Sequence, residues 1–279
     1  MNEEKRTLPE FSDPPVIEVA LGVQFDELPG LKTSHVGLLW EKFRDQLPRT
    51  QDHSPLPPSF EKFDAIPLPQ PSVRFEQVDS PPLLRCWFMS EEEDQMIQIQ
   101  QGRFVHNWRK VGLKEDYPRY GTIRARFFEE LKIFEEFLSK ESLGKLVPNQ
   151  CEITYVNVIV TNDYWETHGQ VDKVLSILSR EYSDSFLPEP ETVSISTQFV
   201  IKQDDNPIGR LHIKGEPVFR QDDMVPGFQL TLTARGEPAG EGLDKILDFM
   251  DIGREWIVRG FTSVTTKMMH DRWGRINNA

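Results

Sequence analysis

The residues best suited to bind or react lie in one short segment, residues 101–110, with the sequence QGRFVHNWRK. If this segment is a strand, its side chains alternate between two faces. One face then carries Phe104, His106 and Trp108, and the other carries Arg103 and Arg109. Residues 102–126 hold seven Lys or Arg and two acids, so the segment is locally basic in a chain whose net charge is −13.

Two interpretations of this segment stay open. Basic residues interleaved with aromatic rings can hold a phosphate, a nucleotide or single-stranded nucleic acid. Alternatively, Phe104 and Trp108 fill the core, His106 is hydrogen-bonded between them, and the arginines pair with an acidic surface. Under the first interpretation, the ligand-binding residues are Arg103, His106, Trp108 and Arg109.

A second polar cluster lies on a strand predicted in the second half of the chain. Arg210, His212, Lys214 and Glu216 occupy every second position, so they share one face. That face is either simply solvated or lines a concave surface of the sheet. In the latter case, Arg210 and His212 are further ligand-binding candidates.

A third cluster lies near the end of the last predicted helix. His270 and Asp271 are adjacent there, so they point in different directions and do not form a catalytic dyad. Cations at this position complement the helix macrodipole, and Trp273 can clamp the helix end. The alternative is that His270 and Trp273 contact a partner.

Signatures of known catalytic classes are absent from the sequence, which contains no GxSxG, GxxxxGK[ST], HExxH or GxGxxG. The six histidines are dispersed, and Cys86 and Cys151 belong to no CxxC or Cys/His cluster. The sequence therefore predicts no metal and no cofactor, and it favours a protein without catalytic activity over an enzyme.

The elements that position these residues follow from hydrophobic periodicity. In the first half, residues 17–25 alternate as a strand does, and a helix follows that Pro48 ends. Residues 48–71 are rich in proline and predict a long loop. Further strands are expected at 72–78, 83–90 and 95–108, the last bent at Gly102, before a helix that Pro118 opens.

The second half follows the same order. We expect a strand at 151–161, a helix at the capping box Thr167–Gln170, three alternating strands, and a long helix from near Glu241 to Met268. Gly253 and Gly260 lie seven residues apart on the apolar stripe of that last helix. Small residues there permit close approach, either to the protein's own sheet or to a second copy, so both glycines are candidate partner-binding residues.

The order β-α-β-β-β-α therefore occurs twice. We expect an irregular arm over residues 1–15, one unit over 16–147 and a second unit over 148–279. The predicted fold class is α+β: the two units join into one curved, largely antiparallel sheet with helices on one face. The TATA-binding protein and the helix-grip proteins use related orders, which is an analogy of fold and not of function.

The composition limits the kinds of partner and the cellular location that we expect. The acidic net charge opposes nucleic-acid binding, which requires Lys and Arg to neutralise phosphates. The N-terminus is charged with no apolar core after it, and no apolar run has the length that spans a bilayer. With two cysteines in apolar runs, we expect a cytoplasmic protein that does not enter a membrane.

Three segments together resemble a known family. They are PPVIEV at residues 14–19, RFVHNWR at residues 103–109 and HDRWG at residues 270–274. The chain resembles a sporadically distributed prokaryotic family of about this length that has no established function. The resemblance covers nearly the whole chain and supplies no catalytic residues. The patchy distribution of such a family suggests a setting in defence or toxin–antitoxin systems.

Two functions are therefore expected. The first is a non-enzymatic interaction protein that binds a partner protein or forms a homodimer. The alternative is a small-ligand or nucleotide-binding protein, or an enzyme, that uses the segment from Arg103 to Lys110 and the polar sheet face.

Overall fold

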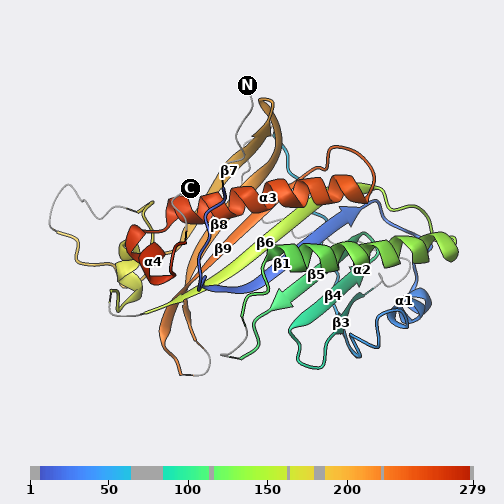
Figure 1. Cartoon of the computed structure of the whole chain (residues 1–279), viewed down its shortest axis with the longest axis horizontal. Helices are drawn as coiled ribbons and strands as arrows, with labels where there is room; N and C mark the ends of the chain where they lie inside the picture. The colour runs from blue at the N-terminus through green and yellow to red at the C-terminus, as the bar shows by residue number, and fades with distance from the viewer. Residues whose placement is uncertain are drawn as a thin grey trace.

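The computed structural model describes residues 7–63, 84–112, 116–161, 164–178, 186–220 and 223–276. Within this part of the chain, nine strands form one sheet in the order β2-β3-β4-β5-β1-β6-β9-β8-β7 (Figure 1). Neighbouring strands are antiparallel throughout. The fold is therefore α+β with an antiparallel sheet, which confirms the predicted class.

The strands and helices have the following bounds. The first half contains β1 (Val16–Phe25), α1 (Thr33–Trp40), β2 (Arg49–His53), β3 (Arg85–Met89), β4 (Gln95–Gln100), β5 (Arg103–Arg109) and α2 (Tyr120–Lys140). The second half contains β6 (Pro148–Val160), the 3₁₀ helix η1 (His168–Lys173), β7 (Ile195–Gln203), β8 (Asn206–Phe219), β9 (Pro226–Gly236), α3 (Leu243–Val264) and α4 (Lys267–Arg272).

Two strands from opposite halves of the chain form the centre of the sheet. β1 pairs with β5 on one side and with β6 on the other, with Leu21 opposite His106 and Ile153. On β1, Val19, Leu21 and Val23 are fully buried, as the alternating pattern predicts. The intervening side chains project to the opposite face of the sheet.

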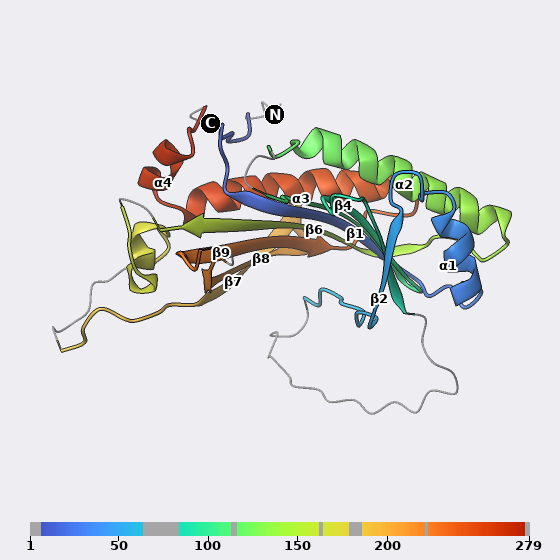
Figure 2. The same cartoon turned by 90° about the horizontal axis from the view of Figure 1, so that it is seen from below.

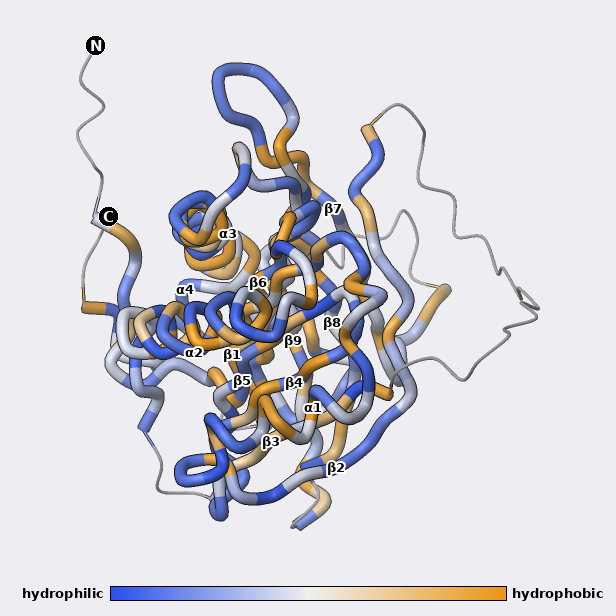
Figure 3. The backbone as a smooth tube through the Cα atoms, turned by 90° about the vertical axis from the view of Figure 1, so that its right-hand side faces the viewer, coloured by the Kyte–Doolittle hydropathy of each residue, from blue (hydrophilic) through white to orange (hydrophobic). Residues whose placement is uncertain are grey.

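The long helices α2 and α3 both cover the same face of the sheet (Figure 2). α2 buries Phe127, Leu131 and Phe134 toward the strands, at the three- and four-residue spacing of an amphipathic helix. Figure 3, coloured by hydropathy, shows hydrophobic and hydrophilic residues alternating along the helices and strands, as expected of elements with one buried side. The core lies between these two helices and the sheet.

Several predicted elements of the first half differ in the structure. Residues 95–108 are not one bent strand, because β4 and β5 form a hairpin in which Gln100 pairs with Arg103 around a two-residue turn. The predicted loop at 48–71 begins with the edge strand β2, which pairs with β3. The strand predicted at 72–78 lies outside the described residues.

Two helices of the second half also differ from the prediction. The segment after Thr167 forms the 3₁₀ helix η1, with a non-helical residue at Gln170. The last predicted helix divides in two. Thr265 turns to extended backbone, and the side chain of Thr266 accepts a hydrogen bond from the Met269 amide at the start of α4. Two β-branched threonines in sequence explain the break, since neither favours the helix interior.

The N-terminal arm packs against the C-terminal end of the chain. The amides of Ser12 and Asp13 donate to the carbonyls of Gly274 and Trp273, at 3.0 Å each. No helix among the described residues combines the length and apolar character that crossing a membrane requires.

Candidate functional site on the helix-free face

The face of the sheet opposite α2 and α3 is polar, and a segment of the same chain crosses it. We call residues 54–63 (SPLPPSFEKF) the strap. Figure 2 shows the chain after β2 on the side of the sheet away from both long helices. The sheet side chains that contact the strap come from six adjacent strands; they are Gln24, Gln100, Arg103, Gln150, Arg210, His212 and Arg235.

The strap crosses the strands in their order in the sheet. Leu56 is bound at β4, Ser59 at β1, and Glu61 at β6 and β8. From β4 to β8 there are five strand spacings of about 4.8 Å, or about 24 Å. The six residues from Leu56 to Glu61 span about 17 Å, or five steps of roughly 3.3 Å, when they are nearly extended, and the side chains of Glu61 and Arg210 bridge the remaining distance. The prolines in the strap favour this conformation and remove backbone donors that would otherwise need partners.

Side chains of the sheet bind the strap through its backbone. Gln100 accepts a hydrogen bond from the Leu56 amide and donates to the Leu56 carbonyl, both at 2.9 Å. Gln24 accepts from the Ser59 amide at 2.8 Å, and Gln150 accepts from the Glu61 amide at 3.4 Å. Such contacts depend little on the strap's side chains, so they suit an extended peptide of varied sequence.

Two arginines complete these backbone contacts. Arg210 donates to the Lys62 carbonyl at 2.7 Å, and Arg103 donates to the Pro57 carbonyl at 3.4 Å. Arg103 also donates to the side-chain oxygen of Gln24 at 2.9 Å, which orients the amide that holds Ser59. The strap is therefore held along most of its length by groups on the sheet.

Glu61 is the strap residue whose charged side chain contacts the sheet. Its carboxylate accepts hydrogen bonds from Arg210 and His212, each at 2.6 Å, and Arg235 lies 3.6 Å away. The Glu61 side chain is only 6% exposed, so these interactions are poorly screened by solvent. Burial raises the pKa of Glu61, but hydrogen bonds from His212 and Arg210 outweigh it, and the pKa lies below its ordinary value.

An aromatic residue completes this end of the strap. The guanidinium of Arg210 lies over the ring of Phe63, 4.5 Å from its centre. Arg210 therefore contacts the strap through a carboxylate, a carbonyl and an aromatic ring. Glu152 forms an ion pair with Arg235, so the cationic side of the cluster is itself held in place.

The structure brings together three of the predicted ligand-binding residues and separates the others. Arg103, Arg210 and His212 all contact the strap on the helix-free face. His106 lies on the opposite face, fully buried, with its Nδ1 2.7 Å from the Glu130 carboxylate on α2. Trp108 is also buried there.

Arg109 lies at the far end of β5 from Arg103. It donates to the Glu93 carbonyl at 3.2 and 3.3 Å and has the Glu93 carboxylate 3.7 Å away. Since β5 alternates, Arg109 is on the same side of the sheet as Arg103, as predicted. Its contacts hold the β3–β4 turn and none of the strap.

The predicted partner-binding residues pack within the chain. A Cβ on Gly253 would lie 2.5 Å from Ile153 of the sheet, and a Cβ on Gly260 would lie 2.7 Å from Leu211. Both glycines therefore let α3 approach its own sheet, which is the first of the two alternatives that the sequence left open.

His270 and Trp273 are likewise buried at the chain ends. The Nε2 of His270 lies 2.8 Å from the Thr265 hydroxyl, and Trp273 packs with its ring 5.0 Å from Phe261 and 6.0 Å from Phe11. Burial lowers the pKa of His270. These residues clamp the C-terminal helix and the N-terminal arm together.

Sequence reasoning missed Glu61, Arg235 and the three glutamines. Glu61 lies in a proline-rich stretch without periodicity, and the glutamines are unremarkable polar positions on separate strands. Only the order of strands in the sheet brings these side chains into one line. The described residues contain no group of His, Cys, Asp and Glu with the arrangement of a metal site.

Comparisons with known proteins returned no match, whether against family models, curated proteins or solved structures.

Proposed function

We propose that the protein is a non-enzymatic interaction protein whose helix-free face binds an extended, acidic segment of a partner protein. The strap occupies this face as an internal stand-in for that segment. The observation that carries the proposal is the pair of contacts at its two ends. The Gln100 side chain binds both the amide and the carbonyl of Leu56. The buried carboxylate of Glu61 contacts Arg210, His212 and Arg235.

Charge complementarity supports an acidic partner. The helix-free face presents Arg103, Arg210, His212 and Arg235 near the strap, and the Glu61 carboxylate lies against the last three of them. A partner segment with Glu or Asp at the position of Glu61 would satisfy the same donors. A partner segment lacking it would leave the buried Arg210 without a carboxylate, which is unfavourable.

The strand order supports a finer description of the fold. Outward from the centre, β1 is followed by β5, β4 and β3, and β6 is followed by β9, β8 and β7. We infer two copies of one β-α-β₃-α unit, related in arrangement to the TATA-binding protein and the helix-grip proteins, with β2 as an addition. The strap then crosses from one unit to the other.

The cellular location is proposed on the state of the cysteines. Cys86 and Cys151 are both free and buried. Burial raises the pKa of the Cys86 thiol to about 12, so it remains protonated and unreactive. We infer a reducing compartment, the cytoplasm.

The test uses a fluorescently labelled synthetic peptide with the strap sequence SPLPPSFEKF, added to the full-length protein. In the variant Glu61→Gln, the internal strap is weakened, so the peptide should bind more tightly than to the wild type. Adding Arg210→Met to that variant should abolish the gain, because the peptide's glutamate loses its partner. A peptide with Gln at the glutamate position is the matched control and should bind weakly.

Two results would contradict the proposal. One is an absence of peptide binding to Glu61→Gln, and the other is binding that Arg210→Met leaves unchanged. If the peptide instead binds as part of a dimer that exchanges straps, light scattering would show doubled mass, and the partner would be a second copy. A melting temperature raised by ATP and not by the peptide would favour the alternative, a nucleotide-binding protein.

A further inference from the structure

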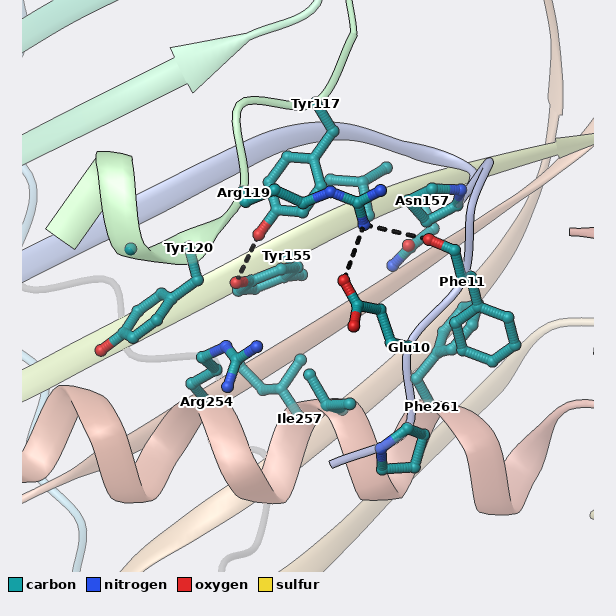
Figure 4. A pocket seen from close by; sticks show the side chains of 15 residues that line it. Glu10, Phe11, Tyr117, Arg119, Tyr120, Tyr155, Asn157, Arg254, Ile257 and Phe261 are labelled. Atoms are coloured by element: carbon teal, nitrogen blue, oxygen red, sulfur yellow. Dashed lines mark hydrogen bonds and ion pairs between the residues drawn. The ribbon is translucent and has the colours of Figure 1, made fainter. Parts of the chain in front are cut away.

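A cavity on the opposite side of the sheet has the composition of a small-molecule site. It lies between the N-terminal arm, the start of α2, strand β6 and helix α3, and its volume is about 160 Å³ (Figure 4). Its apolar walls include Phe11, Val16, Ile257 and Phe261. Its charged lining includes, besides Arg254, the pair of Arg119 and Glu10, which lie 3.9 Å apart. A space of this size accommodates a molecule with about one six-membered ring.

Arg254 provides this cavity with a cation that has no ionic partner. Among the described residues, no carboxylate lies within ion-pair distance of Arg254, and its Nε is buried without a hydrogen-bond partner. The guanidinium lies 4.9 Å from the centre of the Tyr120 ring. The guanidinium also interacts with the Tyr155 hydroxyl, so the buried Nε is the donor that a ligand in the cavity can satisfy.

The neighbouring arginine on α2 is already occupied. Arg124 donates to both carboxylate oxygens of Asp251 at 2.8 Å, and the Tyr120 hydroxyl donates to Asp251 at 2.6 Å. Asp251 is one helical turn from Arg254 on α3, but its charge is held by these donors. Arg254 is thereby left for a ligand.

Two tyrosines add a hydrogen-bond donor beside Arg254. The hydroxyls of Tyr117 and Tyr155 are 2.9 Å apart, so one donates to the other. The accepting hydroxyl still has its own proton to donate. Burial raises the pKa of both tyrosines above the ordinary value of 10, so both hydroxyls stay protonated.

The wall that closes the cavity is held by a strained residue. Arg119 has φ of 68°, in the left-handed region that non-glycine residues rarely adopt. From this position it donates to the carbonyls of Phe11 and Ser12, at 3.0 and 3.4 Å, and so fixes the N-terminal arm over the cavity. Strain of this kind persists where the surroundings require it, and it recurs at binding sites.

We infer that this cavity binds a small carboxylate with an apolar ring or branched body, whose carboxylate pairs with Arg254 and with the free proton of the Tyr117–Tyr155 pair. A single planar guanidinium matches the two oxygens of a carboxylate. A phosphate dianion would need more cationic charge than one unpaired arginine supplies. The apolar walls contact the body of the ligand.

The experiment uses benzoate as the probe and benzamide as its uncharged analogue, with binding followed by NMR chemical shifts of the isotope-labelled full-length protein. Benzoate should bind the wild type and shift resonances of the cavity residues, and benzamide should bind roughly tenfold more weakly or worse. Arg254→Met should weaken benzoate binding by roughly tenfold or more, because it removes the charge while keeping the length of the side chain.

Two further variants separate binding from folding. Tyr155→Phe should weaken benzoate binding without removing the arginine, and Arg259→Met, on the same helix and paired with Glu255, should bind as the wild type does. Melting temperatures confirm that each variant is folded. The inference is overturned if benzoate at about 20 mM shifts no cavity resonance of the wild type. It is also overturned if Arg254→Met or benzamide gives unchanged affinity.

Discussion

Weakening the strap through Glu61→Gln provides a quantitative test of how it is held. The carboxylate accepts hydrogen bonds from Arg210 and His212 at 2.6 Å each. Hydrogen bonds to charged groups contribute about 1.5–3 kcal/mol, and neutral ones about 0.5–1.5 kcal/mol. Glutamine keeps one acceptor but turns an amino group toward these donors, so the net loss should be about 2–3 kcal/mol. The open state of the strap should then become roughly 30- to 150-fold more populated.

Hydrogen exchange measured by mass spectrometry reads this population directly. Within the strap, the amides of Leu56, Ser59 and Glu61 are hydrogen-bonded to glutamine side chains of the sheet, and these bonds exist only while the strap is seated. Their exchange should accelerate by one to two orders of magnitude in the Glu61→Gln variant, while exchange in β1 stays unchanged.

The matched control for that experiment is Asp223→Asn. It makes the same change in charge at an exposed aspartate that pairs with Arg220 and does not contact the strap. Exchange of the strap amides should be as slow in this variant as in the wild type. If Glu61→Gln also leaves exchange of the strap amides unchanged, the carboxylate does not hold the strap and the reasoning is wrong.

Three further predictions concern stability measured by urea unfolding. Because folding lowers the pKa of Glu61, the ionised carboxylate contributes fully to the free energy of unfolding above its ordinary pKa of 4.5 and loses this contribution as the pH falls through the lowered pKa. The difference in free energy of unfolding between the wild type and Glu61→Gln should therefore shrink as the pH falls, and a difference that is independent of pH would contradict this. Gly253→Ala should lower the free energy of unfolding by about 1–3 kcal/mol, because the added methyl group would press on the sheet. Gly37→Ala on α1 adds a methyl group in open space and should raise the free energy of unfolding by about 0.5–1 kcal/mol. Equal effects of the two substitutions would refute the packing argument. Glu130→Ala should cost about 1–3 kcal/mol, because it leaves the buried His106 ring without its hydrogen-bond partner and removes the ion pair with Arg126. The exposed neighbour Glu129→Ala should change stability by less than about 0.5 kcal/mol, and an equally small loss at Glu130 would show that its buried hydrogen bond is dispensable.

The sequence predicts the central strands and the long helices because their burial repeats locally. Val19, Leu21 and Val23 alternate on β1, and Phe127 and Phe134 share one side of α2, as expected from the periodicities of strand and helix. The register of β1 with β6, across more than a hundred residues, carries no such local signal.

The elements predicted wrongly depend on strand pairing, turns or side-chain hydrogen bonds that hydrophobic periodicity does not show. β2 is polar throughout, and it is a strand because its backbone pairs with β3. β4 and β5 read as one strand because the turn at Gln101 and Gly102 interrupts the apolar alternation by only two residues. The helix predicted after Thr167 has the right apolar spacing, but the Gln170 side chain bonds the Glu166 amide and its backbone is non-helical.

The candidate site was predictable only in part. Arg210 and His212 were found because two residues on one strand must share a face. Arg103 was found by its basic and aromatic surroundings, although its aromatic neighbours Phe104 and Trp108 turned out to lie in the core. The strap was missed because the contacts that hold it come from the sheet and leave no pattern in its own sequence.

The most direct test of the central claim is a titration of the isotope-labelled Glu61→Gln protein with the strap peptide, observed through the side-chain amide resonances of Gln24, Gln100 and Gln150. These side chains bind the strap backbone in the structure. If the helix-free face is a docking site for an extended acidic segment, all three resonances shift together and saturate with one affinity. If the three resonances remain unmoved while the peptide binds elsewhere or not at all, the face is not a docking site and the strap is a structural part of the fold.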